Sequence, residues 1–180
     1  MFEVQLVPVG PVDGALLEFI AGCIEDALPA RASVKDARVR LDQAFDPSRG
    51  QHSSTEILAR LLDLEPRPDQ KMLGITDVDL FIPIFTFVFG EAQLGGRVAL
   101  VSVRRLRQEF YGLTPDKALL YARVEKEVLH ELGHTLGLVH CRSFECVMRF
   151  SNSVEEVDLK SSAFCDSCAA LARKALSRRG

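Results

Sequence analysis

The segment from His130 to His140 constrains the fold of this 180-residue chain most, because it spells His-Glu-x-x-His-x-x-Gly-x-x-His. On an α-helix, residues four positions apart lie on one face, so His130 and His134 can both turn an imidazole toward one metal ion. Gly137 can adopt a positive φ, which ends the helix and lets the chain return with His140 as a third ligand. The pattern therefore predicts a long helix that stops at Gly137 and a zinc site made of three histidines.

The number of ligands indicates the chemistry of this site. Three protein ligands leave the fourth position of zinc to water, whose pKa the metal lowers to about 7. Glu131 would take a proton from this zinc-bound water and deliver it to the leaving amine. A lone His-Glu-x-x-His can arise by chance on a helix surface, so the prediction depends on Gly137 and the third histidine. His52 is the fourth histidine of the chain, and we expect it to be exposed in a polar loop.

A second group of candidate metal ligands follows the histidines: the pair Cys141 and Cys146, then the pair Cys165 and Cys168. Their spacing is close to that of structural four-cysteine zinc sites. The second pair opens a predicted helix, whose positive end favours thiolates. A closed zinc site would tie the irregular segment after the histidines to that last helix, and buried thiols or a redox pair are the alternative.

The cysteines and Met148 extend the histidine motif into a pattern that resembles the archaemetzincins, a family of zinc metallopeptidases in the metzincin clan. The clan pattern includes a methionine turn below the zinc, and the resemblance gives this place to Met148. We expect Met148 to be a packed floor and not a ligand. Phe150 stands where some other metzincins place a tyrosine near the metal, so the resemblance implies no tyrosine ligand.

Strand and helix signals alternate along the chain, which predicts an α/β fold. We expect a mixed, mostly parallel five-stranded sheet, a long active-site helix and a small zinc-tied C-terminal subdomain. The expected strands are residues 2–9, 33–41, 72–75, 85–89 and 97–103. The expected helices are residues 14–28, 54–65, 115–136 and one that begins at 165, with Asp13, Ser54 and Thr114 as the first three N-caps.

The resemblance also implies an edge strand beside the zinc cleft that pairs with an extended peptide. We expect this antiparallel edge strand at residues 85–89, because the loop before it is too short for a crossover helix. One metallopeptidase domain would then span residues 1–180, with an N-terminal subdomain at 1–137 and a C-terminal subdomain at 138–180.

Composition limits the partners. The formal net charge is −3, and the largest basic group is Arg104, Arg105 and Arg107, which we expect to open a solvated turn. Nucleic acid is therefore not expected as a partner. The N-terminal segment lacks the features of a secretory signal, and Pro83 interrupts the longest apolar stretch, so we expect a soluble cytoplasmic protein without membrane contact. We also expect a monomer. In a reducing cytosol the cysteines are better explained as metal ligands than as disulfides.

Two classes of function remain at this point. The first is a peptidase with two zinc ions, one catalytic and one structural, that acts on peptides or proteins. The second is a catalytically idle two-zinc scaffold whose groove binds peptides. The intact Glu131 favours the enzyme, because a structural site needs no general base beside an open metal position. A four-cysteine nucleic-acid module is disfavoured by the net charge.

Overall fold

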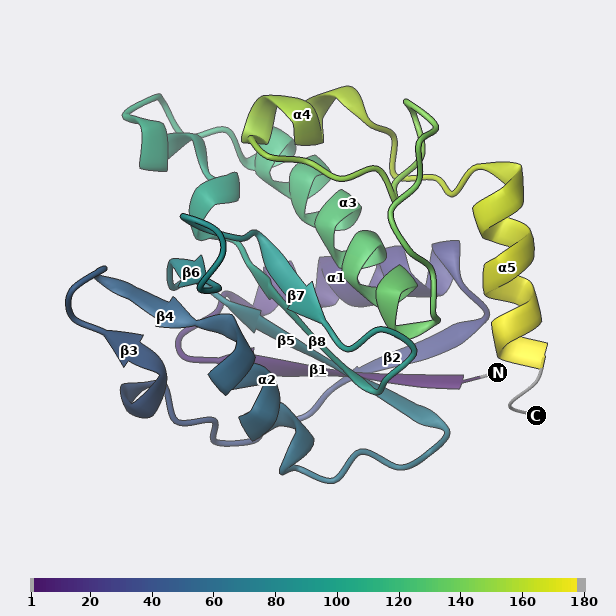
Figure 1. Ribbon diagram of the computed structural model, residues 1–180, viewed down its shortest axis with the longest axis horizontal. Helices are drawn as coiled ribbons and strands as arrows, with labels where there is room; N and C mark the ends of the chain where they lie inside the picture. Colours follow the sequence, from purple (N-terminus) through teal and green to yellow (C-terminus); the bar gives the residue numbers. More distant parts are fainter. Residues whose placement is uncertain (1, 178–180) are drawn as a thin grey trace.

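The computed structural model describes residues 2–177, which form a mixed α/β fold (Figure 1). The strands are β1 (Phe2–Val9), β2 (Ala30–Val34), β3 (Phe45–Asp46), β4 (Gln51–Ser53), β5 (Gln70–Thr76), β6 (Leu80–Phe81), β7 (Gly90–Ala92) and β8 (Val98–Ser102). The α-helices are α1 (Gly14–Ala27), α2 (Ser54–Leu62), α3 (Lys117–Thr135), α4 (Val154–Leu159) and α5 (Asp166–Ser177). Short 3-10 turns lie at η1 (Asp42–Ala44), η2 (Arg104–Leu106) and η3 (Gln108–Tyr111).

The main sheet has five strands in the order β2-β1-β5-β8-β7. The first four strands pair in parallel, and β7 pairs antiparallel with β8 at the edge. This confirms the predicted sheet of five mostly parallel strands with one antiparallel edge. A smaller sheet of β3, β4 and β6, which the sequence did not predict, lies beside it.

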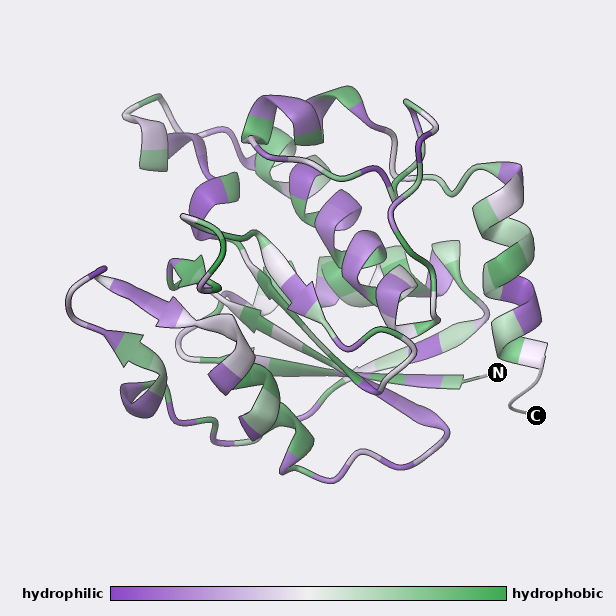
Figure 2. Cartoon of the chain, in the orientation of Figure 1, coloured by the Kyte–Doolittle hydropathy of each residue, from purple (hydrophilic) through white to green (hydrophobic). Residues whose placement is uncertain are grey.

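Alternate side chains of the main strands pack into two hydrophobic cores, one on each face of the sheet. Val4, Leu73 and Val101 pack with α1 and α3 on one face, whereas Met72 and Leu100 pack with α2 on the other. Buried parallel strands carry apolar side chains on both faces, which is why β5 and β8 are buried throughout. Figure 2 shows these hydrophobic strands at the centre of the molecule, under helices that alternate hydrophilic and hydrophobic residues.

The two helices on the α3 side begin at aspartates. Asp13 caps α1 through the backbone N–H of Ala15, as the sequence predicted. Asp116 caps α3 through the N–H of Leu119, so the predicted cap at Thr114 was wrong by two residues. Asp is a stronger N-cap than Thr, and the structure places Thr114 before the first turn. Ser53, not Ser54, caps α2.

The edge strand differs in position from the prediction. Residues 85–89 form no strand, apart from an isolated bridge between Val88 and Leu80, and the edge strand is β7. The physical reason is a turn, closed by the N–H of Phe85 on the carbonyl of Ile82, that bends this segment. Side chains of Arg49 and Gln51 then donate to the carbonyls of Phe85 and Thr86, which a neighbouring strand would otherwise pair. Similarly, β2 ends at Val34, so the predicted strand at 33–41 overlaps it by only two residues, and the short helix α4 was missed.

Two polar residues are also less exposed than predicted. The ring of His52 lies 5.0 Å from that of Phe45 and is partly buried. Arg105 forms a two-pronged ion pair with Asp79, so the basic turn is not simply solvated. Within residues 2–177, none of the helices combines the length and apolar character that crossing a membrane requires.

Candidate active site

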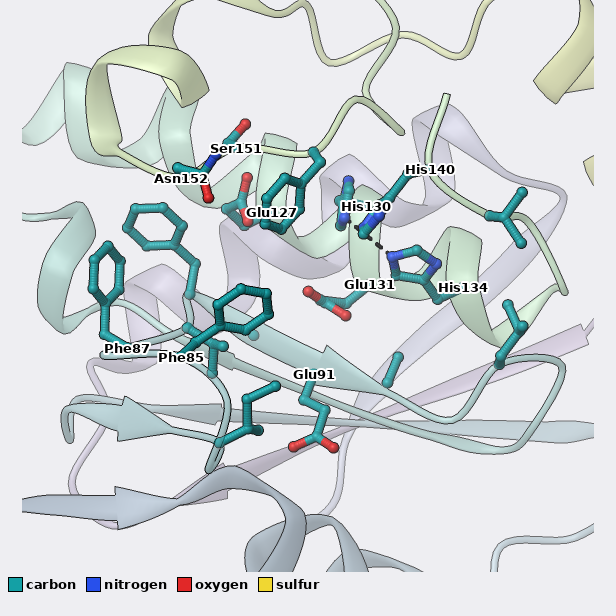
Figure 3. A pocket seen from close by; sticks show the side chains of 18 of the residues that line it. Phe85, Phe87, Glu91, Glu127, His130, Glu131, His134, His140, Ser151 and Asn152 are labelled. Carbon is teal, nitrogen blue, oxygen red and sulfur yellow. Dashed lines mark hydrogen bonds between the residues drawn. The ribbon is translucent and has the colours of Figure 1, made fainter. Parts of the chain in front are cut away.

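The three histidines of the sequence motif meet at the C-terminal end of α3. His130 and His134 lie one turn apart on the helix, and His140 returns from the segment that follows it (Figure 3). One ring nitrogen from each lies within 4.8 Å of the other two. His130 is buried, His134 is half-buried and His140 is exposed, so the group closes toward the protein and opens toward solvent.

The ring orientations of the two helical histidines fit a metal ion. Nδ1 of His130 donates to the carbonyl oxygen of Val147, and Nδ1 of His134 donates to that of Leu138, each at 2.8 Å. In a neutral imidazole, a protonated Nδ1 leaves Nε2 with a lone pair. The two Nε2 atoms face each other at 3.1 Å. Two zinc ligands at a tetrahedral angle would be about 3.3 Å apart, so these atoms are arranged for a shared cation.

The electrostatics agree with this arrangement. Burial is the main cause that lowers the pKa of His130, and the positive charge of Lys160 lowers it further. Burial also lowers the pKa of His134 and of His140. All three imidazoles therefore favour the neutral form, which is the form that binds metals.

Gly137 ends the helix as predicted, with φ 92°. Its N–H donates to the carbonyl of His134, and the N–H of Leu138 donates to that of Gly133. This pair of bonds is a Schellman motif, which requires a left-handed residue that glycine adopts without strain. The turn brings His140 to the other two histidines, where its ring lies 4.9 Å from that of Phe150.

Glu131 projects from α3 toward the edge strand beside the histidines (Figure 3). Its side chain is buried, and burial followed by the charge of Glu127 raises its pKa well above the usual range. A Cβ at Gly90 in β7 would lie 2.8 Å from Oε1 of Glu131. The absence of a side chain at Gly90 therefore makes the room that this carboxyl occupies.

Met148 lies beneath the histidine helix, as the sequence predicted. It is fully buried, and a Cβ at Gly133 would collide with its sulfur. Gly133 lies between the two helical histidines in sequence, so the methionine packs directly against the helical turn that carries them. The chain around it is also held, because the carbonyl of Met148 accepts from the N–H of Cys141 at 2.9 Å.

The four cysteines Cys141, Cys146, Cys165 and Cys168 converge between the turn and α5, with their sulfurs within 4.8 Å of one another. Sγ of Cys141 lies 3.8 Å from Sγ of Cys165, far beyond a disulfide bond but equal to the spacing of two thiolates on one tetrahedral zinc, about 3.8 Å. A hydrogen bond from the backbone N–H of Cys168 lowers the pKa of Cys165 to about 7, whereas burial raises that of Cys146. The donor set fits a closed zinc site.

A cleft of about 410 Å³ runs along the histidines between β7 and the C-terminal segment. Its lining joins the three histidines and Glu131 to residues of the loop before β7 and of the segment after Met148. The sequence did not predict one pair in this lining, Glu127 with Lys160. Glu127 lies one turn before Glu131 on the same helix face, which is a local signal, but nothing local in the sequence points to Lys160.

Comparison with known proteins agrees with the geometry. Residues 34–174 match the model of peptidase family M54. The chain is 41% identical to the archaemetzincin of Methanocaldococcus jannaschii, over 93% of this chain and 91% of that protein.

Solved structures show the same fold. The crystal structure of the archaemetzincin from Methanopyrus kandleri is 37% identical, with a TM-score of 0.87 over 98% of this chain and 96% of that one. The archaemetzincin from Archaeoglobus fulgidus, solved as a complex with malonate, is 39% identical with a TM-score of 0.80, over 94% of this chain and 99% of that one.

Proposed function

The chain belongs to peptidase family M54, the archaemetzincins, and we propose that this zinc metallopeptidase uses Glu131 as the general base of peptide hydrolysis. The observation that carries the proposal is the place of Glu131, a buried carboxyl between Gly90 of the edge strand and the three-histidine group, at the wall of the cleft.

We assign the catalytic zinc to His130, His134 and His140. When bound there, zinc supplies a Lewis acid that polarises the scissile carbonyl and makes water acidic enough to lose a proton at neutral pH. Glu131 takes that proton and delivers it to the leaving amine. A cation held by the neighbouring histidines favours the carboxylate form of Glu131, which is the form that can accept this proton.

The assignment of a second, structural zinc rests on Cys141, Cys146, Cys165 and Cys168. The spacing of the sulfurs supports thiolate ligation of one tetrahedral zinc. This zinc would join the segment after His140 to α5, so that one metallopeptidase domain combines an N-terminal part, residues 1–137, and a C-terminal part, residues 138–180. Gly137 and Met148 support the sites without binding metal.

The substrate is a peptide or protein, and β7 offers it a place to pair. β7 pairs with β8 on one side, and within residues 2–177 no strand pairs with its other side. An extended peptide could add there by backbone hydrogen bonds, which set its register over the histidines.

The decisive experiment replaces Glu131 with Gln in protein that carries its full zinc content. The amide keeps the size of the side chain but cannot accept the proton, so we expect turnover of a peptide library to fall by about 10²–10⁴-fold while the zinc content stays the same. Glu125→Gln is the matched control, because Glu125 lies on the same helix outside the cleft. If the zinc-loaded wild type cleaves nothing, or if the mutant keeps full activity, the proposed mechanism is wrong.

A further inference from the structure

The cleft is chemically different on the two sides of the histidines. On one side it is lined by small and aliphatic residues, Ala92, Leu94 and Val139. On the other side lie aromatic rings and then polar side chains, and Figure 3 shows Phe85, Phe87, Glu127, Ser151 and Asn152 together there. We call this second side the aromatic subsite. It is defined by Phe85, Phe87, Phe89, Phe150, Glu127, Ser151, Asn152 and Lys160.

The walls of the aromatic subsite contact one another and two arginines that lie outside it. The ring of Phe85 lies 6.1 Å from that of Phe150, and the backbone carbonyl of Phe85 accepts from the guanidinium of Arg49 at 2.8 Å. The guanidinium carbon of Arg105 lies 4.2 Å from the ring centre of Phe87. Rings that already pack against neighbours lose less freedom when they bind a ligand, and those of Phe85 and Phe150 are also partly exposed to the cleft, so the walls favour a flat apolar group.

The inner end of the subsite is polar and buried. Nζ of Lys160 lies 2.9 Å from Oε1 of Glu127, and both side chains are almost wholly buried. No hydrogen bond of good geometry reaches this oxygen, and the buried hydroxyl of Ser151 also has no partner within residues 2–177. Lys160 donates one further bond, to the carbonyl of Arg149 at 3.2 Å. An ammonium has three donors, so this end combines an acceptor, Glu127, with donors of Lys160 and Ser151.

A phenol hydroxyl matches this combination, because it donates one hydrogen bond and accepts others. A phenyl ring would leave the polar atoms unpaired. Lysine and arginine side chains only donate, and carboxylates only accept. A further charge would also disturb a buried pair that is already neutral. Serine and threonine carry a hydroxyl but are too small to fill the aromatic walls.

We infer that the aromatic subsite binds a tyrosine side chain of the substrate next to the scissile bond, with its hydroxyl between Glu127, Lys160 and Ser151. The inference rests on the proposed peptidase function, since it names the side chain that this cleft selects. It assigns specificity to Glu127 and Lys160 and no step of the reaction.

The test compares peptides that differ only in one residue, Tyr, Phe, Lys, Glu or Gln, moved stepwise along an otherwise constant sequence. Binding is measured with zinc-loaded Glu131→Gln protein, and cleavage with the wild type. At one position we expect Tyr to exceed Phe by about ten- to a hundredfold in both affinity and kcat/KM, because buried polar groups discriminate against a ligand that leaves them unpaired.

Two variants should each create a preference for a charged side chain, of opposite sign in the two cases. Lys160→Met leaves the carboxylate of Glu127, so the peptide with Lys should gain relative to Phe. Glu127→Gln leaves the ammonium of Lys160, so the peptide with Glu should gain relative to Phe. Each variant leaves one charge of a buried pair without its partner, which impairs folding. Ser151→Ala therefore provides a mild third test, in which the Tyr-to-Phe ratio falls. Leu94→Ala, on the aliphatic side, is the control and should leave that ratio unchanged.

The outcomes separate this inference from the proposed function. Equal binding of Tyr and Phe at every position, or a Gln preference as large as that for Tyr, overturns the inference even if the wild type cleaves both peptides. A Tyr preference in binding without any cleavage supports the subsite and overturns the peptidase mechanism. A Tyr preference that survives Ser151→Ala and both charge variants undiminished would place the hydroxyl elsewhere and also overturn the inference.

Discussion

The histidine group and the cysteine group are adjacent in sequence, since Cys141 follows His140, yet they differ in exposure and in the number of side chains that could bind a metal. The histidine group ends in an exposed imidazole and lies on a cleft beside a buried carboxyl. The cysteine group has four sulfurs, two of them in buried residues, and lies between the turn and α5. An open position permits catalysis, whereas four thiolates close the coordination and stabilise the fold. On this account, one short segment around His140 and Cys141 contributes both to a catalytic metal site and to a structural one.

The two groups are also connected through that segment. The carbonyl of Val147, which orients His130, follows directly on Cys146, and the carbonyl of Met148 accepts from the N–H of Cys141. The cysteine group therefore holds the strip of chain that orients the first histidine. Loss of zinc from the cysteine group should therefore disturb the histidine group, while loss of zinc from the histidine group should leave the cysteine group intact.

The largest expected effect comes from breaking the closed site. Cys146→Ser removes a ligand that is 1% exposed and leaves a buried hydroxyl in its place. We expect loss of one zinc and a fall of more than about 4 kcal/mol in the free energy of unfolding, measured by urea denaturation with metal analysis. Cys23→Ser is the matched control, because Cys23 lies on α1 outside the group, and it should change neither the zinc content nor the fold. Equal stability of the two variants would refute the structural role.

A smaller loss of stability is expected from truncation of Met148, which lies beneath the histidine helix. Met148→Ala removes a fully buried side chain that packs against Gly133, so we expect a loss of about 2–5 kcal/mol in unfolding free energy with the zinc content unchanged. Thermal melting and metal content are measured together. Loss of the histidine-bound zinc at unchanged stability would instead indicate that Met148 is a ligand.

The smallest expected change in stability lies at the edge strand. Gly90→Ala would place a Cβ 2.6 Å from the backbone carbonyl of Leu100 and 2.8 Å from Glu131, so either the strand or the carboxyl must move. We expect a loss of about 1–3 kcal/mol and a larger proportional loss of kcat, with both zinc ions retained. Unchanged turnover in this variant would show that the position of Glu131 tolerates displacement, and would weaken the contrast between the two groups.

The sequence predicted the features that depend on local spacing. The helical pair His130 and His134, the turn at Gly137 and the cysteine pairs all follow from distances along the chain, and the structure brings each set together. The edge strand was misplaced because residues 85–89 have β propensity, but their backbone carbonyls accept from Arg49 and Gln51, which are distant in sequence. Lys160 was missed for the same reason, since its partner Glu127 is distant in sequence.

The most direct test of the account is stepwise removal of zinc from fully loaded wild-type protein, with zinc release, peptidase activity and far-UV circular dichroism recorded on one sample. We expect mild chelation to remove one zinc and all activity while the circular dichroism spectrum stays unchanged. Only stronger chelation should remove the second zinc, together with the folded structure. Simultaneous release of both ions, unfolding on release of the first, or at most one zinc after full reconstitution would contradict the division into an open catalytic site and a closed structural site.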